Sequence, residues 1–270
     1  MSEATETRRR RLRLRRRKER RKRVAMTVVD HLHELRSRIM VSLVAFVVIS
    51  GAAFFFYEPL LNFLKDPLCQ VPRDLLGPQG CDLNFFRITG AFQFRLKLTA
   101  LVGIALTSPV WLYNLYAFIV PALTLKEKRY SLPFLFSSII LFSIGTTFAY
   151  LTLPKGVEFL IELGGGLIPI LGAEEYLNFV GLILIAFGVT FQLPLVLIFL
   201  GLVGAVTVEQ LRAQRKVALV AIFVLAAVVT PSQDPYTMSI MALPLYGLYE
   251  LTIIILAQVM KRRAAAAPSG

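Results

Sequence analysis

Cysteine and histidine, which build many metal and redox sites, are scarce in this sequence. The 270 residues include two cysteines and two histidines. His31 and His33 are separated by one residue, so on a helix they point to different faces, and no cysteine or third histidine lies near them. The signature motifs of zinc proteases, serine hydrolases and phosphate-binding loops are also missing. We therefore predict no metal site, no cofactor and no enzymatic activity.

Charged residues are missing from long stretches of the chain, and hydrophobic residues make up 56% of it. A helix needs roughly 20 apolar residues to cross the ~30 Å hydrocarbon layer of a bilayer. Six long apolar runs predict transmembrane helices at about 39–57, 97–120, 131–153, 176–202, 216–230 and 238–260. We expect an all-α polytopic membrane protein, with one membrane domain over residues 26–263 and a short C-terminal tail at 264–270. No room remains for a separate soluble catalytic domain.

The fifth and sixth predicted spans are short. Residues 217–230 give a helix of about 21 Å at the usual rise per residue, and Glu250 interrupts the sixth apolar run. A span shorter than the bilayer is accommodated by local thinning or by snorkelling of flanking charges. We therefore expect a thinned membrane beside these two spans.

The net charge of +13 is concentrated in the N-terminal residues 1–25, where thirteen Lys and Arg face three Glu. Such a run repels itself, which predicts a disordered tail. Because it precedes a membrane span, we expect it to contact anionic lipid. No aromatic residue interleaves it, so there is no platform for base stacking and no nucleic-acid partner is predicted.

The connections between spans alternate in charge. The tail, the second and fourth connections and the C-terminal end are basic, whereas the first, third and fifth carry more acidic than basic residues; Arg95 and Lys97, which follow the first, fit this pattern less well. Since cytoplasmic loops retain Lys and Arg, six spans with both termini in the cytoplasm fit best. Cys69 and Cys81 then fall in the first outer connection, where pairing is chemically allowed. A disulfide and two free thiols are the alternatives, and we expect this proline-containing loop to be an ordered, partly helical cap.

Four polar side chains stand out at or within the membrane. Glu34 precedes span one, Glu127 is the single acid in a basic inner loop, Gln192 lies deep in span four and Glu250 lies within span six. Simple structural roles exist for three of them. Glu34 has Arg38 at i,i+4, Glu127 has neighbouring bases, and Gln192 is placed to bond the carbonyl that Pro194 frees. Glu250 has no such explanation, and a membrane carboxylate is by default a candidate functional residue.

Several motifs, in order along residues 29–260, resemble those of the TatC family, the signal-peptide receptor of the twin-arginine translocase. The entry sequence His31-Leu32-His33-Glu34-Leu35-Arg36-Ser37-Arg38 resembles H-L-x-E-L-R-x-R. Residues 108–123, 143–150 and 186–194 resemble the family's spans two to four, Thr230-Pro231 and Asp234 its T-P-x-D turn, and 244–250 its sixth span. The chain departs by having Gln192 where some members have Glu, and by a turn one residue longer. The basic tail and the cysteine pair lie outside the general pattern.

This resemblance implies a receptor and scaffold in the bacterial cytoplasmic membrane, with a concave bundle and no enzymatic activity. Glu34 and Glu127, with Arg36 and Arg38 beside them, are expected to bind the paired arginines of an export signal. The implied partners are TatA, TatB, other TatC copies and folded cargo that carries such a signal, with the proton-motive force expected to be used. Contacts with partner helices or intramembrane polar roles are implied for Gln192, Glu250, Thr230, Phe118 and Pro121, and Asp234 is expected in a periplasmic turn.

A secondary transporter is the alternative class of function. It would need ionisable groups at the bilayer midplane, broken helices and an internal repeat. Glu250 is the single charged residue within the apolar part of a span, and the two halves of the chain show no repeat. A receptor and scaffold is therefore the favoured interpretation.

Overall fold

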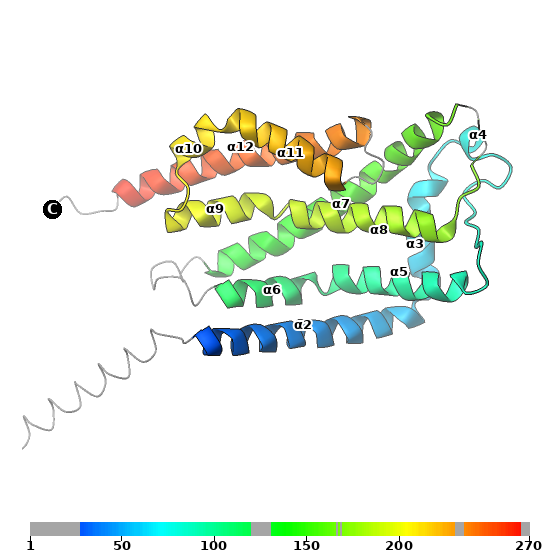
Figure 1. Cartoon of the computed structure of the whole chain (residues 1–270), viewed down its shortest axis with the longest axis horizontal. Helices are drawn as coiled ribbons and strands as arrows, with labels where there is room; N and C mark the ends of the chain where they lie inside the picture. The colour runs from blue at the N-terminus through cyan, green and yellow to red at the C-terminus, as the bar shows by residue number, and fades with distance from the viewer. Residues whose placement is uncertain (1–27, 120–130, 166, 168, 230–234, 266–270) are drawn as a thin grey trace, which may run out of the picture.

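The computed structural model describes residues 28–119, 131–165, 167, 169–229 and 235–265, and within them the chain folds into helices with no named strand (Figure 1). The prediction of an all-α membrane protein is confirmed. The helices are α2 (Val28–Phe55), α3 (Tyr57–Cys69), α4 (Arg73–Leu76), α5 (Gly90–Leu106), α6 (Ser108–Ile119), α7 (Ser131–Glu162), α8 (Ala173–Thr190), α9 (Leu193–Val203), α10 (Val208–Ala213), α11 (Arg215–Val229) and α12 (Pro235–Ala265).

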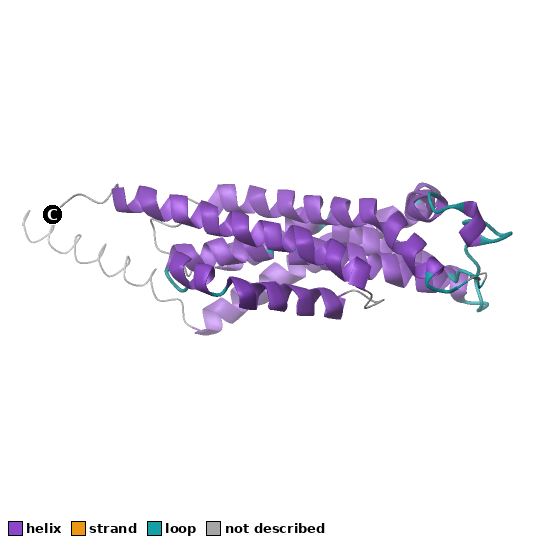
Figure 2. Ribbon diagram, turned by 90° about the horizontal axis from the view of Figure 1, so that it is seen from above, coloured by secondary structure: helices purple, strands orange, loops and turns teal. Residues whose placement is uncertain are grey.

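The long helices run side by side, and most of the described loop residues gather at one end of the bundle (Figure 2). We call this the cap end, because α3, α4 and the segments 77–89, 163–165 and 169–172 lie there (Figure 1). The opposite end, where α2 begins and α6 ends, is called the tail end. By length and composition, four helical stretches in the described residues can cross a membrane: His31–Phe55, Pro133–Glu162, Ala173–Val203 and Pro235–Lys261.

A fifth crossing is possible if α5 and α6 form one span, because they meet at a bend of 53°. Pro109 has no backbone N–H, so it cannot bond the carbonyl four residues before it, and the helix breaks at Thr107. Side chains bond the carbonyls of the last α5 turn. The Thr107 hydroxyl donates to the Gly103 carbonyl at 2.6 Å, and the Trp111 ring N–H donates to the Ile104 carbonyl at 3.2 Å. The bend is therefore a hydrogen-bonded part of the fold.

The short fifth span and the short sixth span have different outcomes. Helix α11 has 15 residues, or about 22 Å at 1.5 Å per residue, in line with a short fifth span. The prediction of a short sixth span was wrong, because α12 is a continuous helix of 31 residues. Glu250 interrupts the apolar run but not the helix, since glutamate is a good helix former, and its carboxylate accepts a hydrogen bond from Arg215 at 2.7 Å. A paired carboxylate is far less costly near lipid than a free one.

Helix α3 lies across the long helices at the cap end (Figure 1) and packs on α7 and α5. Pro67 lies inside α3 and cannot donate to the carbonyl of Phe63. The Tyr150 hydroxyl from α7 donates to that carbonyl at 2.8 Å, and its ring stacks on Phe63 with centroids 4.4 Å apart. The Tyr176 hydroxyl from α8 donates to the next carbonyl, that of Leu64, at 3.0 Å. Two tyrosines therefore fix α3 across the bundle.

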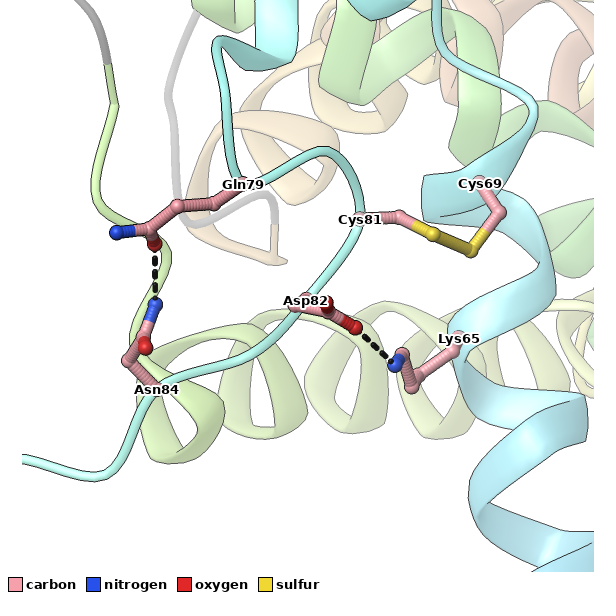
Figure 3. Close-up of polar contacts among 6 residues, drawn as sticks. All are labelled: Lys65, Cys69, Gln79, Cys81, Asp82 and Asn84. Carbon is pink, nitrogen blue, oxygen red and sulfur yellow. Dashed lines mark hydrogen bonds and ion pairs between the residues drawn. A yellow bond between two sulfur atoms is a disulfide. The ribbon is translucent and has the colours of Figure 1, made fainter.

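The cap is tied together beyond α3 (Figure 3). Cys69 and Cys81 form a disulfide, so of the two alternatives the structure contains the paired form. The Lys65 ammonium lies 3.0 Å from an Asp82 carboxylate oxygen beside that bond. Backbone bonds from Asn84 N–H to the Leu171 carbonyl and from Ala173 N–H to the Asn84 carbonyl, both 2.9 Å, join the two cap segments. The expectation of an ordered, partly helical cap is confirmed.

Among the described helices, α7 and α8 share the most extensive contact. A Cβ added at Gly145 would lie 2.9 Å from the Phe187 backbone carbonyl and 2.8 Å from the Phe191 ring. The glycine lets the two backbones approach, which is the usual device for packing helices in a membrane. Phe148, Phe187 and Phe191 then stack around this contact. The pair α7–α8 is thus the frame on which α3 and α5 pack.

Candidate functional site

Glu34 lies at the tail end, two turns into α2. One carboxylate oxygen, Oε1, accepts a hydrogen bond from the Arg38 guanidinium at 3.2 Å, so the i,i+4 pair expected from the sequence is present. The other, Oε2, is buried and has no hydrogen-bond partner among the described residues. The Glu34 side chain is 21% exposed and the Arg38 side chain is 30% exposed. Glu34 therefore presents an acceptor oxygen that Arg38 does not use.

Arg36, which was grouped with this site in the sequence, is exposed, and the role expected for it remains a prediction. It follows Glu34 by two residues, and side chains two apart on a helix do not face each other. The ring of His31 stacks on that of Phe118 with centroids 4.2 Å apart, which joins the start of α2 to the end of α6. Phe118, predicted to contact partner helices, thus packs within the chain.

A buried polar group one turn deeper was missed from the sequence. The Asn114 side-chain amide donates to the Ser42 hydroxyl at 3.1 Å and to the Val110 carbonyl at 3.0 Å. The Ser42 hydroxyl in turn donates to the Arg38 carbonyl at 3.0 Å. Asn114 is 5% exposed. Its position inside a long apolar run was the available signal, because a polar residue there needs a partner helix. Asn114 holds α6 against α2 just beyond the Glu34–Arg38 pair.

Four predicted site residues cannot be placed. Glu127 and Pro121 fall within residues 120–130, and Thr230 and Asp234 fall within 230–234; both segments lie outside the described residues. The roles expected for them remain predictions. The described neighbour of the first segment is α6, whose Phe118 contacts His31.

Gln192 lies in the short break between α8 and α9. Its amide N–H donates to the Ser138 backbone carbonyl at 3.0 Å, and its amide oxygen accepts from the Ser138 hydroxyl at 2.8 Å. The sequence interpretation that Gln192 bonds the carbonyl freed by Pro194 was therefore wrong. The amide instead makes a reciprocal pair with α7. A glutamate ionised at this position would bring an acceptor against the Ser138 carbonyl, which suits the uncharged amide found here.

Glu250 on α12 faces α11. Its carboxylate accepts from Arg215 at 2.7 Å and from the Tyr246 hydroxyl at 3.2 Å. The neighbouring Tyr249 hydroxyl donates to the Leu211 carbonyl of α10 at 2.7 Å. Glu34, Gln192 and Glu250 thus each bond a different group, and these bonds do not join them into one centre. In the described part of the chain no group of three or more His, Cys, Asp or Glu residues is arranged to hold a metal ion.

A family model described as Sec-independent protein translocase protein (TatC) matches residues 30–244. The chain belongs to the TatC family. A Frankia casuarinae member, Sec-independent protein translocase protein TatC, is 42% identical over 238 residues, which are 85% of this chain and 65% of that protein. The Aquifex aeolicus member is 37% identical over 234 residues, 85% of this chain and 94% of that protein.

Solved structures of TatC family members have the same fold. A crystal structure of the twin-arginine translocase receptor TatC in DDM superposes with a TM-score of 0.71 at 38% identity, covering 83% of this chain and 98% of that one. The Corynebacterium kroppenstedtii TatC is 35% identical, and this chain matches 63% of its length. The chain therefore spans about two thirds of the Frankia and Corynebacterium relatives and nearly all of the Aquifex one.

Proposed function

We propose that this chain is the receptor subunit of a twin-arginine translocase, and that it binds the arginine pair of an export signal at Glu34. The observation that carries the proposal is the buried Glu34 Oε2, which has no partner among the described residues although Oε1 is bonded to Arg38. A guanidinium offers several N–H donors in a planar fork that matches a carboxylate. Membership of the TatC family supports this assignment.

The second arginine of the signal is assigned to Glu127. Its loop follows α6, and the His31–Phe118 contact brings the end of α6 to the start of α2. We expect Glu34 and Glu127 each to accept one guanidinium of the pair. A lysine pair keeps the charge but loses the bidentate fork, so it should bind more weakly.

The test is binding of fluorescent signal peptides to the purified full chain in lipid nanodiscs. We expect a peptide with Arg-Arg to bind more tightly than the same peptide with Lys-Lys. A hydrogen bond to a charged group contributes about 1.5–3 kcal/mol, so Glu34→Gln should weaken Arg-Arg binding roughly ten- to a hundredfold. The same loss is expected for Glu127→Gln.

Glu158→Gln provides the matched control, because Glu158 is an acid at the other end of the bundle whose pair with Lys155 is unrelated to the site. It should leave peptide affinity unchanged. Equal affinity for the Arg-Arg and Lys-Lys peptides, or undiminished binding by the Glu34→Gln/Glu127→Gln double variant, would contradict the proposed function.

The proposed partners are TatA- and TatB-type helices and further copies of this chain. Gln192 and Glu250, the intramembrane candidates, are already engaged with Ser138 and Arg215. A partner helix that uses them must compete for these bonds. Interhelical hydrogen bonds in membranes average only ~0.6 kcal/mol, so such exchange is reversible. Contact of the basic tail with anionic lipid also remains part of the proposal.

We further propose that the protein lies in the bacterial cytoplasmic membrane with the tail end facing the cytoplasm. Arg212 lies in α10, and Arg215 and Lys216 begin α11, at that end. The acidic residues of the end of α7 and the start of α8 lie near the cap end: Glu158, Glu162, Glu174 and Glu175. This distribution follows the positive-inside rule. The disulfide of the cap is then placed on the oxidising side.

A further inference from the structure

Glu34 already holds a guanidinium that belongs to this chain. Arg38 lies one turn further along α2, and its Nη2 donates one hydrogen bond to Glu34 Oε1 at 3.2 Å. The second oxygen, Oε2, is buried without a hydrogen-bond partner among the described residues. A guanidinium and a carboxylate can form two parallel bonds, so this single bond is less than the pair could make. Arg38 therefore occupies the Glu34 carboxylate without satisfying it.

Arg38 and an arginine of an export signal need the same oxygen atom. A bidentate fork takes both carboxylate oxygens, so a guanidinium that binds Glu34 in this way must take Oε1 from Arg38. Because Oε2 is buried, an incoming guanidinium reaches it only after a neighbouring group has moved. Two guanidinium groups that share one carboxylate also repel each other. Binding of the signal at Glu34 therefore requires that the Arg38 head leave.

Little besides Glu34 holds the Arg38 side chain in place. It makes no other hydrogen bond or ion pair within the part of the chain that the structure describes. Since it is partly exposed, its charged head reaches water by rotation about the bonds of its long stem. Its backbone is held separately, because the Arg38 carbonyl accepts from the Ser42 hydroxyl, which accepts from Asn114 of α6. The side chain can thus move away while α2 stays in position.

We propose that Arg38 is an internal competitor for Glu34, which occupies the carboxylate until the arginine of an export signal displaces it. The inference rests on the proposed function and deepens it by assigning a residue that lowers the affinity for the signal. Ion pairs at this spacing on a helix are weak, so a forked guanidinium displaces Arg38 readily. The competitor reduces the apparent affinity of any cation in proportion to the fraction of molecules in which Glu34 is open.

The test is a double-mutant cycle on Glu34 and Arg38, measured as binding of the Arg-Arg signal peptide to the full chain in nanodiscs. Arg38→Met removes the competing guanidinium and keeps an unbranched side chain that favours a helix. We expect it to tighten binding about two- to fivefold, as for a site that is open in roughly 20–50% of molecules. In the Glu34→Gln background the same substitution should change affinity by less than about twofold, because no carboxylate remains to compete for.

Two further variants guard against other causes of a gain or a loss. Arg38→Gln is a second neutral substitution and should give the same gain, so the result does not depend on methionine being tolerated at this position. Arg212→Met is the matched control for charge. Arg212 is an exposed base of α10 at the tail end, and none of the ion pairs among the described residues includes it. Its replacement should leave the affinity for the peptide unchanged.

The inference is overturned if neither neutral variant of Arg38 binds the peptide more tightly than the unmodified chain. It is also overturned if the gain persists in full in the Glu34→Gln background, or if Arg212→Met gives an equal gain, because repulsion by nearby positive charge would then be the cause. Failure of the proposed function shows differently, as undiminished binding when Glu34→Gln is the only change. That result would overturn both.

Discussion

At the scale of single residues, polar side chains in this bundle bond backbone carbonyls that lack a helical donor. Pro67 removes the donor for the Phe63 carbonyl, and the Tyr150 hydroxyl replaces it. We predict that Tyr150→Phe lowers the free energy of unfolding by about 1–3 kcal/mol, because it leaves that carbonyl unpaired while the ring stacking persists. Thermal unfolding in detergent measures the loss.

The control for this substitution is Tyr113→Phe, which removes a hydroxyl from a ring that is 50% exposed on α6. Its melting temperature should match that of the unmodified chain. An unchanged melting temperature for Tyr150→Phe would show that the Phe63 carbonyl is satisfied in another way.

At the scale of helices, close approach of α7 and α8 depends on Gly145. A methyl group there meets the Phe187 carbonyl and the Phe191 ring at 2.8–2.9 Å, and a backbone atom cannot rotate away. We predict that Gly145→Ala destabilises the protein by about 1–3 kcal/mol through overpacking. Unfolding of the purified variant by heat or denaturant checks this.

The comparison is Gly51→Ala on α2, where nothing lies within 4 Å of the added Cβ. Alanine is the better helix former by up to ~1 kcal/mol, so this variant should be as stable as the unmodified chain or more so. If the two alanine substitutions had the same effect, the tight α7–α8 contact would not be what sets stability.

At the scale of the whole molecule, orientation is the property that the proposed function most requires. We predict that a cysteine introduced at Leu163, near the cap, reacts with a membrane-impermeant maleimide in intact cells. A cysteine at Gln214, between α10 and α11, should react only after permeabilisation. The native cysteines are paired with each other and do not react. The reverse labelling pattern would contradict a cytoplasmic tail end.

The sequence predicted the all-α class, the short α11 and the helical cap, because apolar length, charge and proline positions determine these locally. It also predicted the Glu34–Arg38 pair, which depends on helical spacing alone. Three features needed the fold: the Gln192–Ser138 pair, the Glu250–Arg215 pair and the contact of Asn114 with Ser42. Each joins residues at least 35 positions apart, so the spacing of residues along one helix cannot predict it.

The error about α12 has the same origin. In the sequence alone, Glu250 is an unpaired charge within an apolar segment. In the fold, Arg215 from the preceding helix forms an ion pair with it. The bend between α5 and α6 was also not predicted, although the sequence contains Pro109 at that point. A proline indicates where a helix is weakened. The bend itself is stabilised by the side chains of Thr107 and Trp111, which bond carbonyls of the last α5 turn.

The disulfide between Cys69 and Cys81 joins residues only twelve positions apart, and its oxidation state reports whether the first outer connection has crossed the membrane. In the proposed orientation, a polypeptide whose first hairpin has not yet crossed keeps two thiols in the reducing cytosol, whereas a fully inserted one has none. Alkylation with a mass-adding reagent before electrophoresis would therefore separate the two populations. The protein thus carries a built-in, tag-free marker of its own membrane integration.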